Sequence, residues 1–579
     1  MDEIYRNLVR LNEEWAEAGL ARQVRDPESK YDGGIIHAET GVPSPNHLNT
    51  PAVMASWAGA FCNPDSRRYR DPLLLDAFEA AAGFMVNRQH ADGTVSLGST
   101  NYNSPPDTAF VVGGLSQVYR LLGTDGWREA EAAAQKVKLF LERTIPALLT
   151  GGAHTPNHRW VITAALAQLY EIFSLPELLD RAREWLAEGL DITEDGEWTE
   201  RSNGIYNAVS NISLYHTARV MNRPELLDYV RRNLRMMIYL VHPDGDVVTD
   251  YSGRQDLGQT FDLSNYFLVC RLMAAHDRDP LMASLSDKAA SYLSSYREGV
   301  NNHPMVGLLL FPSGLDGMGR EPLPDTYRKA FNLGHPVREH LRLLEETGHH
   351  GKIQHSSMHY AFGFPVVRIR EKDTSITMMA QAPSFFALRH GQARLLGVKL
   401  SSSFPPGVVP LEELRVEEDR YTFRTVMEKG YSGPIPAEIL AGLPAREGAS
   451  PWYLLPHQHR PVTHLQKHAL GVEAVPVTGG WQLRVFSDER EDVFTQLTLV
   501  LGQEGTVEGD GVEEFAANRY FLKKGSVTYA AGPDRLEISG GVFDHRLGEL
   551  RNDAWPPGCK YLHFNLLTPF DHTIELRLL

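Results

Sequence analysis

At Gly348-His349-His350-Gly351-Lys352 the sequence changes from a helical to a strand-like pattern. Before this segment, apolar residues recur at the three- and four-residue spacing of amphipathic helices. After about residue 358 the chain consists of short segments rich in Val, Ile, Thr, Phe and Tyr, which are typical of antiparallel strands. We therefore predict two domains, a helical one at residues 1–350 that carries the catalytic groups and an antiparallel β-sandwich at residues 351–579 that contributes to the cleft.

Helical periodicity is clearest in eight segments: Leu73 to Val86, Thr108 to Leu122, Arg128 to Leu149, Trp160 to Phe173, Pro176 to Leu190, Tyr206 to Val220, Pro224 to Val241 and Asp262 to Ala275. Asp-Gly turns at Asp92-Gly93, Asp195-Gly196 and Asp244-Gly245 are separated by one or two lengths of about fifty residues, which fits a repeat of two helices and two loops. About six such pairs fit the helical half. Because a sheet domain follows at once, we favour a closed α/α toroid over an open solenoid.

The strand-like segments begin near Phe364 and continue to the end of the chain. They include Phe364 to Arg370, Ser375 to Met379, Arg420 to Arg424, Trp481 to Phe486 and Thr573 to Leu578. Their β-branched and aromatic residues and the turn residues between them predict an antiparallel sheet.

Composition and charge exclude several classes of function. The 579 residues carry a formal net charge of −16, with acidic residues spread along the chain, so nucleic acid and anionic membranes are disfavoured as partners. An acidic sugar is still compatible with this charge if local Arg, His, Asn and Tyr side chains supply donors. No uninterrupted apolar run approaches eighteen residues, and no signal peptide is evident at Met1, so we expect a cytoplasmic protein unless a leader has been removed.

Cysteine usage does not indicate a disulfide framework. The chain has three cysteines, Cys62, Cys270 and Cys559, which are far apart in the sequence. An odd number of widely spaced cysteines makes a cysteine-rich zinc site improbable as well.

The first candidate site stretch is Thr155-Pro156-Asn157-His158-Arg159-Trp160, at the start of a predicted helix. Helix N-termini favour anions, so Asn157 and His158 at such an end suit a carboxylate. The alternative is that Asn157 is only an N-cap and His158 only a first-turn residue.

The second stretch, residues 200–211, places several polar side chains around Tyr206 at a turn-to-helix junction, with Asn207 beside it. We take Tyr206 as a candidate catalytic residue and Asn207 as a candidate substrate-binding residue. The alternative for the tyrosine is an amphipathic side chain that covers the core.

The third stretch, residues 348–360, contains the junctional His355 and His359. Clefts often form at domain junctions, so these imidazoles are further candidates for the site. Four His in eleven residues also fit a metal cluster, but no Cys or Asp stands at ligand spacing.

Two other loops supply candidate substrate-binding residues. Tyr251 and Arg254 follow the Asp244-Gly245 turn, and Arg254 has the geometry to hold a carboxylate with two hydrogen bonds. An Arg among three Asp also fits a local salt-bridge network. Asn101 and Tyr102 precede another helix after an Asp-Gly turn and are candidates to line a subsite.

Together, the helical half, Asn157-His158 at a helix start, Tyr206 about fifty residues later and a junctional His before a sheet half resemble the heparinase II/III-like and alginate-lyase superfamily of polysaccharide lyases. The resemblance implies an α/α toroid followed by a β-sandwich. It also implies β-elimination on uronic-acid-containing poly- or oligosaccharides, which leaves a 4,5-unsaturated uronate end.

Roles for individual residues follow from the same resemblance. Asn157 and His158 would neutralise the uronate carboxylate, Tyr206 would be the catalytic acid, and His355 the second base candidate with His359 as its rival. The apparent lack of a leader favours an enzyme that acts on imported oligosaccharides. We expect the pKa of the Tyr206 phenol, near 10 when free, to be lowered by neighbouring His and Arg.

No cofactor is required for such chemistry, although some relatives hold a structural divalent ion. In the sheet half, His457-Gln458-His459 is the close His pair that would be considered for such an ion. The expected partner is an acidic glycan, without nucleic acid or membrane, and an oligomer is compatible with the sequence.

Two other functions stay open. A glycoside hydrolase on the same toroid needs two carboxylates beside the scissile bond, for which Asp107, Glu200 and Asp250 are the loop acids. A non-catalytic carbohydrate-binding protein would bind sugar without turnover.

Overall fold

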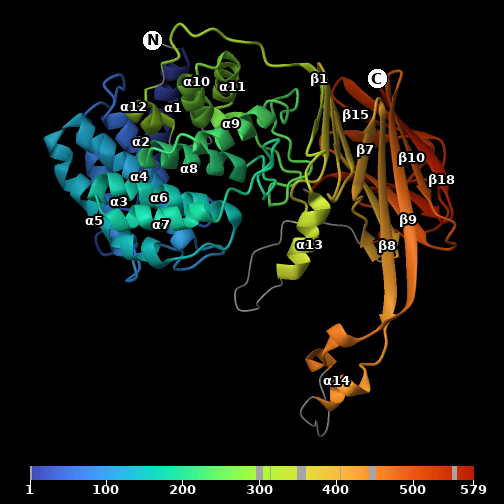
Figure 1. The fold of residues 1–579 in the computed structure, drawn as a ribbon. Helices are drawn as coiled ribbons and strands as arrows, with labels where there is room; N and C mark the ends of the chain where they lie inside the picture. Colours follow the sequence, from blue (N-terminus) through green and yellow to red (C-terminus); the bar gives the residue numbers. More distant parts are fainter. Residues whose placement is uncertain are drawn as a thin grey trace. The chain divides into compact units, whose positions relative to one another are not determined.

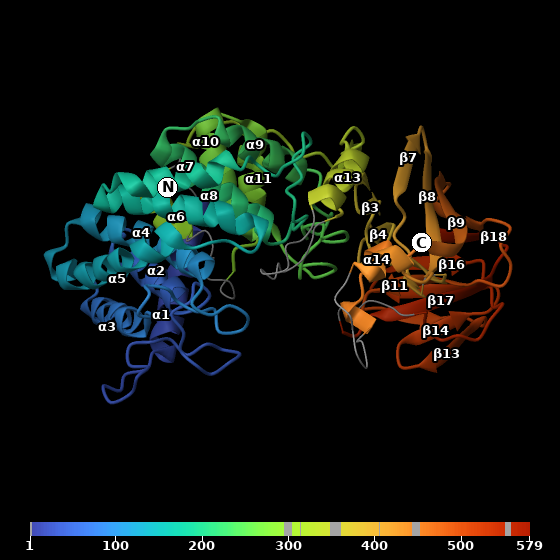
Figure 2. The same cartoon turned by 60° about the horizontal axis from the view of Figure 1, so that its bottom comes forward.

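The computed structural model describes residues 3–294, 304–312, 314–347, 360–404, 406–442, 452–550 and 557–579. It divides into two compact units, Met1–Gly363 and Phe364–Leu579 (Figures 1 and 2). The predicted domain boundary at residues 350/351 lies outside the described residues.

The first unit contains thirteen described α-helices. Their bounds are α1 Glu3–Arg22, α2 Thr50–Phe61, α3 Pro72–Arg88, α4 Pro105–Asp125, α5 Glu131–Thr150, α6 Pro156–Phe173, α7 Pro176–Ala187, α8 Tyr206–Met221, α9 Leu226–Met237, α10 Phe267–Asp277, α11 Pro280–Ala290, α12 Pro304–Leu310 and α13 Val337–Thr347. Strand β1 (Thr326–Phe331) lies between α12 and α13 in the sequence.

The even-numbered helices from α2 to α12 form a closed inner ring, because α2 packs on α4, α4 on α6, α6 on α8, α8 on α10, α10 on α12 and α12 on α2. The odd-numbered helices from α1 to α11 pair with them, so the ring has six helix pairs. The fold class is therefore confirmed: the helical half is an α/α toroid rather than an open solenoid.

All eight predicted helices are present, with ends displaced by a few residues. The helices that the periodicity missed include α2, in which all twelve residues are buried. A helix buried on every side has no polar face, so no amphipathic period marks it in the sequence.

The Asp-Gly turns mark real repeats of this unit. Gly93, Gly196 and Gly245 have φ values of +85°, +105° and +93°, a region that glycine enters without strain. A Cβ at Gly93 would meet the carbonyl oxygen of Arg143, and a Cβ at Gly196 that of Arg232. The turns at Gly93 and Gly196 therefore need glycine both for conformation and for close packing against an outer helix.

The second unit is a β-sandwich of two sheets, as predicted. One sheet has the order β2-β3-β4-β5-β11-β17-β14-β13, with β6 paired to β5, and the other has the order β12-β15-β16-β18-β10-β9-β8-β7. All described pairs in them are antiparallel except β14 with β17, which is parallel. Phe386 and Trp481, from opposite sheets, pack with their ring centroids 5.6 Å apart in the core between the sheets.

The strands of this unit have the following bounds: β2 Val366–Glu371, β3 Thr374–Met379, β4 Phe386–His390, β5 Ala393–Ser403, β6 Pro406–Val408, β7 Glu413–Glu417, β8 Arg420–Ser432, β9 Val462–Val477, β10 Gly480–Ser487, β11 Phe494–Leu501, β12 Thr506–Glu508, β13 Val512–Ala516, β14 Arg519–Leu522, β15 Ser526–Ala531, β16 Asp534–Ser539, β17 Lys560–Leu567 and β18 Asp571–Leu578. Each of the five predicted strand segments falls on one of them.

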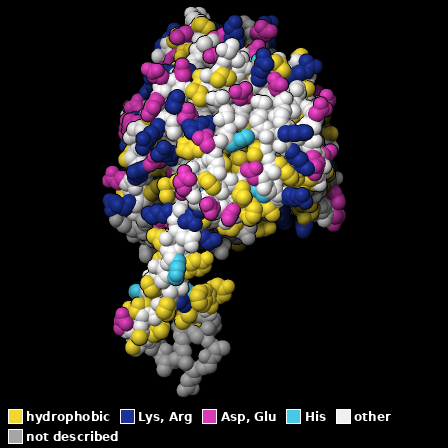
Figure 3. Space-filling model, turned by 90° about the vertical axis from the view of Figure 1, so that its right-hand side faces the viewer, with side chains coloured by type: hydrophobic (Ala, Val, Ile, Leu, Met, Phe, Trp, Pro, Cys, Tyr) yellow, Lys and Arg dark blue, Asp and Glu magenta, His cyan; other side chains and the backbone are white. Residues whose placement is uncertain are grey.

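Strands β8 and β9 extend beyond the sandwich as a two-stranded arm that carries the short helix α14 (Ala437–Ala441) (Figure 1). The described part of the arm exposes apolar side chains, visible in yellow in Figure 3. Tyr453, for example, is 89% exposed. In the described part of the chain, no helix combines the length and the apolar character needed to cross a membrane.

Candidate functional site

The first two predicted stretches and the loop before α4 meet where the inner helices α4, α6 and α8 begin. Asn157 is the second residue of α6, Tyr206 is the first residue of α8, and Asp107 lies in the first turn of α4. The proline at the start of α4 and of α6 fits the first helical turn, where its missing N–H costs nothing. Neighbouring inner helices thus bring side chains from distant sequence positions to one cluster.

Glu200 is the centre of this cluster. Its Oε2 accepts hydrogen bonds from the backbone N–H of Asn157 at 3.0 Å and from Asn157 Nδ2 at 2.7 Å. Its Oε1 accepts from the guanidinium of Arg254, and both side chains are largely buried. Asn157 is therefore not an N-cap, because its amide points to a carboxylate, and Thr155 occupies the cap position.

Arg254 connects this carboxylate with Tyr206. The guanidinium carbon lies 4.3 Å from the centre of the Tyr206 ring, a cation–π distance. The ion-pair partner of Arg254 is Glu200, and Asp256 of its own loop adds a favourable electrostatic interaction. Gln255 Nε2 donates to the Tyr206 hydroxyl at 2.6 Å.

The expected lowering of the Tyr206 pKa is wrong. Burial raises the pKa of Tyr206, and the carboxylates of Asp256 and Asp107 raise it further, whereas the hydrogen bond from Gln255 lowers it. Desolvation disfavours the phenolate, and the sequence could not show how deeply the ring would be buried. Tyr206 is consequently a protonated phenol in the unliganded protein.

His158 is buried beside His154, with ring centroids 4.6 Å apart. Burial lowers the pKa of His158 to about 3, and the charges of His154, Arg254 and His47 lower it further. The ring is therefore neutral near pH 7. Its Nδ1 is buried and has no hydrogen-bond partner among the described residues.

A second layer fixes the loop that carries these groups. Asp256 accepts hydrogen bonds from Ser202 Oγ at 3.0 Å, from the Gly204 N–H at 3.0 Å and from Ser252 Oγ. Asn207 Nδ2 donates to Asn203 Oδ1 at 2.8 Å. Asn207 is thus near Tyr206 but buried, and its Oδ1 has no partner among the residues that the structure describes.

Asn101 and Tyr102 lie on the loop before α4. Asn101 Nδ2 donates to Asp107 Oδ2 at 2.8 Å, and Ser104 Oγ donates to the same oxygen at 2.5 Å. Tyr102 is 69% exposed, and its hydroxyl donates to the carbonyl of Gly98. Of the two, Tyr102 offers the open ring face, and a role in substrate binding stays a prediction for both.

Tyr251 lies in the interior, with 1% of its surface exposed. The guanidinium carbon of Arg201 lies 4.8 Å from the centre of its ring. Arg201 in turn donates to the carbonyl of Ala361 at 2.7 Å. A buried Tyr251 is better placed to stabilise the loop than to contact a sugar directly. Its predicted role in substrate binding stays a prediction.

His355 and His359 lie outside the described residues, so their relation to the cluster stays a prediction. In the sandwich, both His457 ring nitrogens are engaged, one with the Trp452 carbonyl and the other with Arg460 Nε. Within the described ranges, no group of three or more His, Cys, Asp and Glu side chains is arranged to hold a metal ion.

Sequence reasoning missed three members of the site or undervalued them. Glu200 was considered only as a hydrolase acid, although it organises Asn157 and Arg254. Gln255 was not considered, although its neighbour Arg254 was. His47 comes from a loop before α2 and stacks on Phe110 at 4.5 Å; a lone histidine in a loop gives no signal in a sequence.

No protein-family model matches the sequence, and no curated protein is similar to it in sequence. Solved structures nevertheless show that the chain has the fold of polysaccharide lyases. The crystal structure of heparinase III matches with a TM-score of 0.53 and 11% identity, over 98% of this chain and 84% of that one. The structure of Paenibacillus xanthan lyase matches with a TM-score of 0.55 and 8% identity, over 100% of this chain but 57% of that one. At such low identity the similarity establishes the fold alone.

Proposed function

We propose that this protein is a lyase that cleaves uronic-acid-containing poly- or oligosaccharides by β-elimination. The observation that carries the proposal is the buried chain of contacts from Asn157 through Glu200 and Arg254 to the ring of Tyr206. In the unliganded protein, the donors of Asn157 and Arg254 already hold one carboxylate, that of Glu200. A uronate carboxylate has the same geometry and would compete for these donors.

The elimination removes the proton from C5 of the uronate, forms the C4–C5 double bond and breaks the bond between C4 and the leaving oxygen. Hydrogen bonds to the C6 carboxylate stabilise the negative charge that develops when the C5 proton leaves. Asn157 and neutral His158 are the proposed donors, and the low pKa of His158 suits an N–H donor better than a base.

Tyr206 is the proposed acid that protonates the leaving oxygen. Its raised pKa keeps the proton on the phenol, and Gln255 donates to its oxygen. Among the described residues no acceptor takes the phenolic proton, which is therefore available to a leaving group. The base at C5 is assigned by prediction to His355, with His359 as the alternative.

The test is a panel of alginate, heparan, hyaluronan, pectin-type and rhamnose-glucuronate oligomers, followed by the ultraviolet absorbance of the new conjugated double bond. Turnover of at least one substrate with this signal supports the proposal. New reducing ends without the signal would identify a hydrolase, and binding without turnover a carbohydrate-binding protein.

Tyr206→Phe is expected to lower kcat by about a hundredfold or more, in the range typical of a lost general acid, with substrate affinity kept. Tyr229→Phe, on the outer helix α9, is the matched control and should retain full activity. A fully active Tyr206→Phe enzyme would remove this tyrosine from the mechanism.

A further inference from the structure

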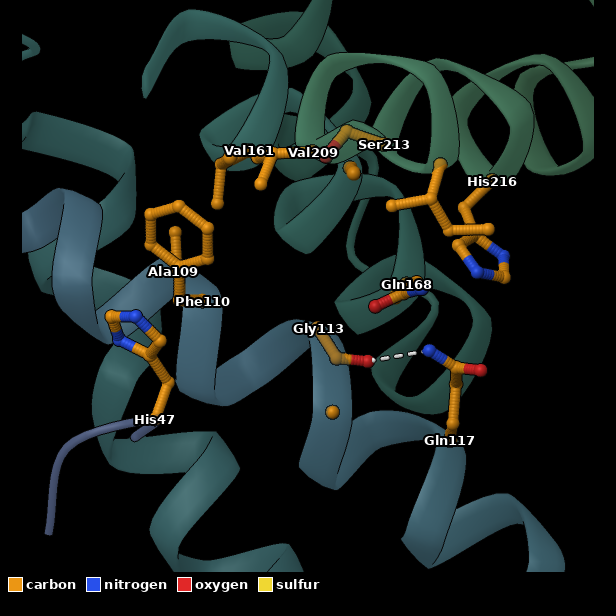
Figure 4. Close-up of a pocket in the computed structure, with 13 residues that line it drawn as sticks. His47, Ala109, Phe110, Gly113, Gln117, Val161, Gln168, Val209, Ser213 and His216 are labelled. Carbon is orange, nitrogen blue, oxygen red and sulfur yellow. Dashed lines mark hydrogen bonds between the residues drawn. The ribbon is translucent and has the colours of Figure 1, made fainter. Parts of the chain in front are cut away.

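Outside the catalytic cluster, the helical unit contains a narrow slot between α4, α6 and α8 (Figure 4). Oε1 of Gln117, Oε1 of Gln168 and the ring nitrogens of His216 line it and are buried without partners among the described residues. Its volume of about 40 Å³ suits ordered water that bonds to these atoms. Gln168 and His216 lie eleven and ten residues along their helices from Asn157 and Tyr206. The slot is therefore out of reach of a sugar held at the cluster.

The sandwich offers a different feature, a concentration of apolar surface at the end of the β8–β9 arm (Figure 3). We call residues 430–442 and 452–466 the arm tip. Among the described residues of the chain, 22 large apolar side chains are exposed, and seven of them lie in the arm tip. These seven are Tyr431, Leu440, Trp452, Tyr453, Leu454, Val462 and Leu465.

The backbone of the arm has little support from its own sheet. Beyond Arg424 of β8 and Leu470 of β9, the two strands pair only with each other among the described strands. A ribbon of two strands is marginally stable in water. Its outer edges and exposed apolar side chains would therefore be stabilised by contact with another surface.

The tip nevertheless has a defined structure, which is organised by Arg460. The Arg460 guanidinium donates to the Gly433 carbonyl at 2.8 Å and to His457 Nδ1 at 3.1 Å, and its carbon lies 4.5 Å from the centre of the Trp452 ring. Because Nδ1 of His457 accepts, its Nε2 carries the proton and donates to the Trp452 carbonyl at 2.6 Å. Tyr453 follows Trp452 and is 89% exposed. These contacts pre-organise the tip and so reduce the entropy lost when it binds a partner.

The composition of the arm tip is that of an interface core. Its 28 residues include two charged ones, Glu438 and Arg460, whereas 22% of the whole chain is charged. Interface cores are depleted in charge and enriched in Trp, Tyr and Arg, which also dominate binding energy.

The exposed area of the tip is also sufficient for a stable contact. An aromatic side chain carries about 150–250 Å², so the three aromatic residues of the tip expose roughly 400 Å². With the four aliphatic side chains added, the area approaches the roughly 800 Å² that each partner contributes to an interface of standard size.

We propose that the arm tips of two copies of this chain pack against each other about a two-fold axis, so that the protein is a homodimer. Two copies that each carry a net charge of −16 repel each other at long range. Contact through a charge-poor surface avoids adding like charges at short range. In a two-fold contact the same patch of both copies meets itself, so one interface covers both apolar tips.

Two other occupants fit the tip less well. Segments that lie on a membrane surface hold lipid headgroups with several Lys and Arg, whereas the described tip has Arg460 alone, already bonded within the tip. An acidic glycan likewise needs several donors for its carboxylates. The ring of Trp452 also contacts Arg460 and His457, which limits its use as a stacking face for sugars.

Sedimentation velocity of the full chain tests this proposal and needs no substrate, so its outcome is independent of the proposed function. The wild-type protein should have twice the monomer mass of 64.8 kDa, because interfaces of standard size give micromolar or tighter affinity. Leu454→Asp should raise the dissociation constant of the dimer about tenfold or more, since the two-fold axis buries two new charges at once. Tyr453→Ser, which removes an exposed ring without adding charge, should have the same direction of effect.

Leu73→Asp is the matched control. Leu73 is 56% exposed, close to the 64% of Leu454, but it lies in the first turn of α3, where an acidic residue is tolerated. This variant should change the dissociation constant less than twofold. Circular dichroism of all variants should match the wild type, because each replaced side chain is exposed.

Two results would overturn the proposal. One is a wild-type protein that stays monomeric at micromolar concentration, and binding of that monomer to phosphatidylcholine vesicles would identify a membrane as the occupant instead. The other is a dimer that Leu454→Asp and Tyr453→Ser leave as stable as Leu73→Asp does, because the two copies would then meet through another surface.

Discussion

At the scale of single residues, the energetics of the site depend on Glu200. Its carboxylate neutralises the buried guanidinium of Arg254 and accepts both hydrogen bonds from Asn157. Removing one partner of a buried ion pair leaves the other charge uncompensated, which costs more than the pair itself contributes. Glu200 is thus a structural requirement for the site in addition to any role in the reaction.

Glu200→Gln is therefore expected to destabilise the helical unit by about 3 kcal/mol. The measurement is urea unfolding followed by circular dichroism of the helices. Glu194→Gln is the control, because Glu194 forms an ion pair with Arg232 while 95% exposed, and such pairs contribute less than about 1 kcal/mol. Equal stability of the two variants would contradict the inference that Glu200 stabilises the helical unit by compensating the buried charge of Arg254.

Glu197 makes the stability of the helical unit depend on pH. Burial raises the pKa of Glu197 to about 7, although Arg201 and the Gly363 N–H lower it in part. The pKa of Glu197 is higher in the folded state than in the unfolded chain. The contribution of this carboxyl to the free energy of unfolding is therefore largest below pH 4 to 5. It declines as the pH rises, because the folded carboxyl retains a proton that the unfolded chain releases.

The expected decline for the wild-type protein is about 3 kcal/mol between pH 4.5 and pH 7, at about 1.4 kcal/mol for each pKa unit. Glu197→Gln should remove this part of the pH dependence, so that the variant gains stability relative to the wild type as the pH rises. Thermal unfolding at pH 5 and pH 8 measures the difference. Parallel pH profiles of the two proteins would be inconsistent with a buried, titrating Glu197.

At the scale of elements, the Asp-Gly turns hold the inner and outer helices in register. Gly196 combines a φ of +105° with a close approach to α9, where an added Cβ would lie 2.5 Å from the Arg232 carbonyl oxygen. Gly189 has a φ of +83° but no atom within 4 Å of such a Cβ. Comparing alanine variants at the two positions therefore distinguishes the cost of backbone strain from the cost of steric overlap.

Gly189→Ala should cost about 1–2 kcal/mol, the penalty of a left-handed alanine. Gly196→Ala should cost about 1–3 kcal/mol more, because the overlap forces α9 to shift. Denaturant midpoints of the two variants give the comparison. If both variants lose the same free energy of unfolding, the close approach of Gly196 to α9 does not exclude an alanine side chain.

At the scale of the whole molecule, two units with separate cores share one chain. The toroid is closed by α12, a helix of seven residues that packs on both α10 and α2. The sandwich has its own apolar core between two sheets, in which Phe386 and Trp481 meet. The similarity to heparinase III extends over 98% of the chain, so both units belong to the shared architecture.

Much of this architecture could be predicted from local patterns. Periodicity located α6 and α8, runs of β-branched and aromatic residues located β2 and β10, and the Asp-Gly pairs marked the repeat, because each of these signals is local in the sequence. The patterns failed at α2, where complete burial removes the amphipathic period, and at α12, which is too short to show one.

The sequence by itself determined the two-part order of helices and strands, the repeat length and the candidate residues Asn157, Tyr206 and Arg254. Only the tertiary structure decided that Glu200 joins Asn157 to Arg254, that burial raises the pKa of Tyr206, and that Gln117, Gln168 and His216 share a slot. The reason is physical: hydrogen bonding and desolvation depend on distances between side chains from different helices, and those distances exist only after the ring of helices has closed.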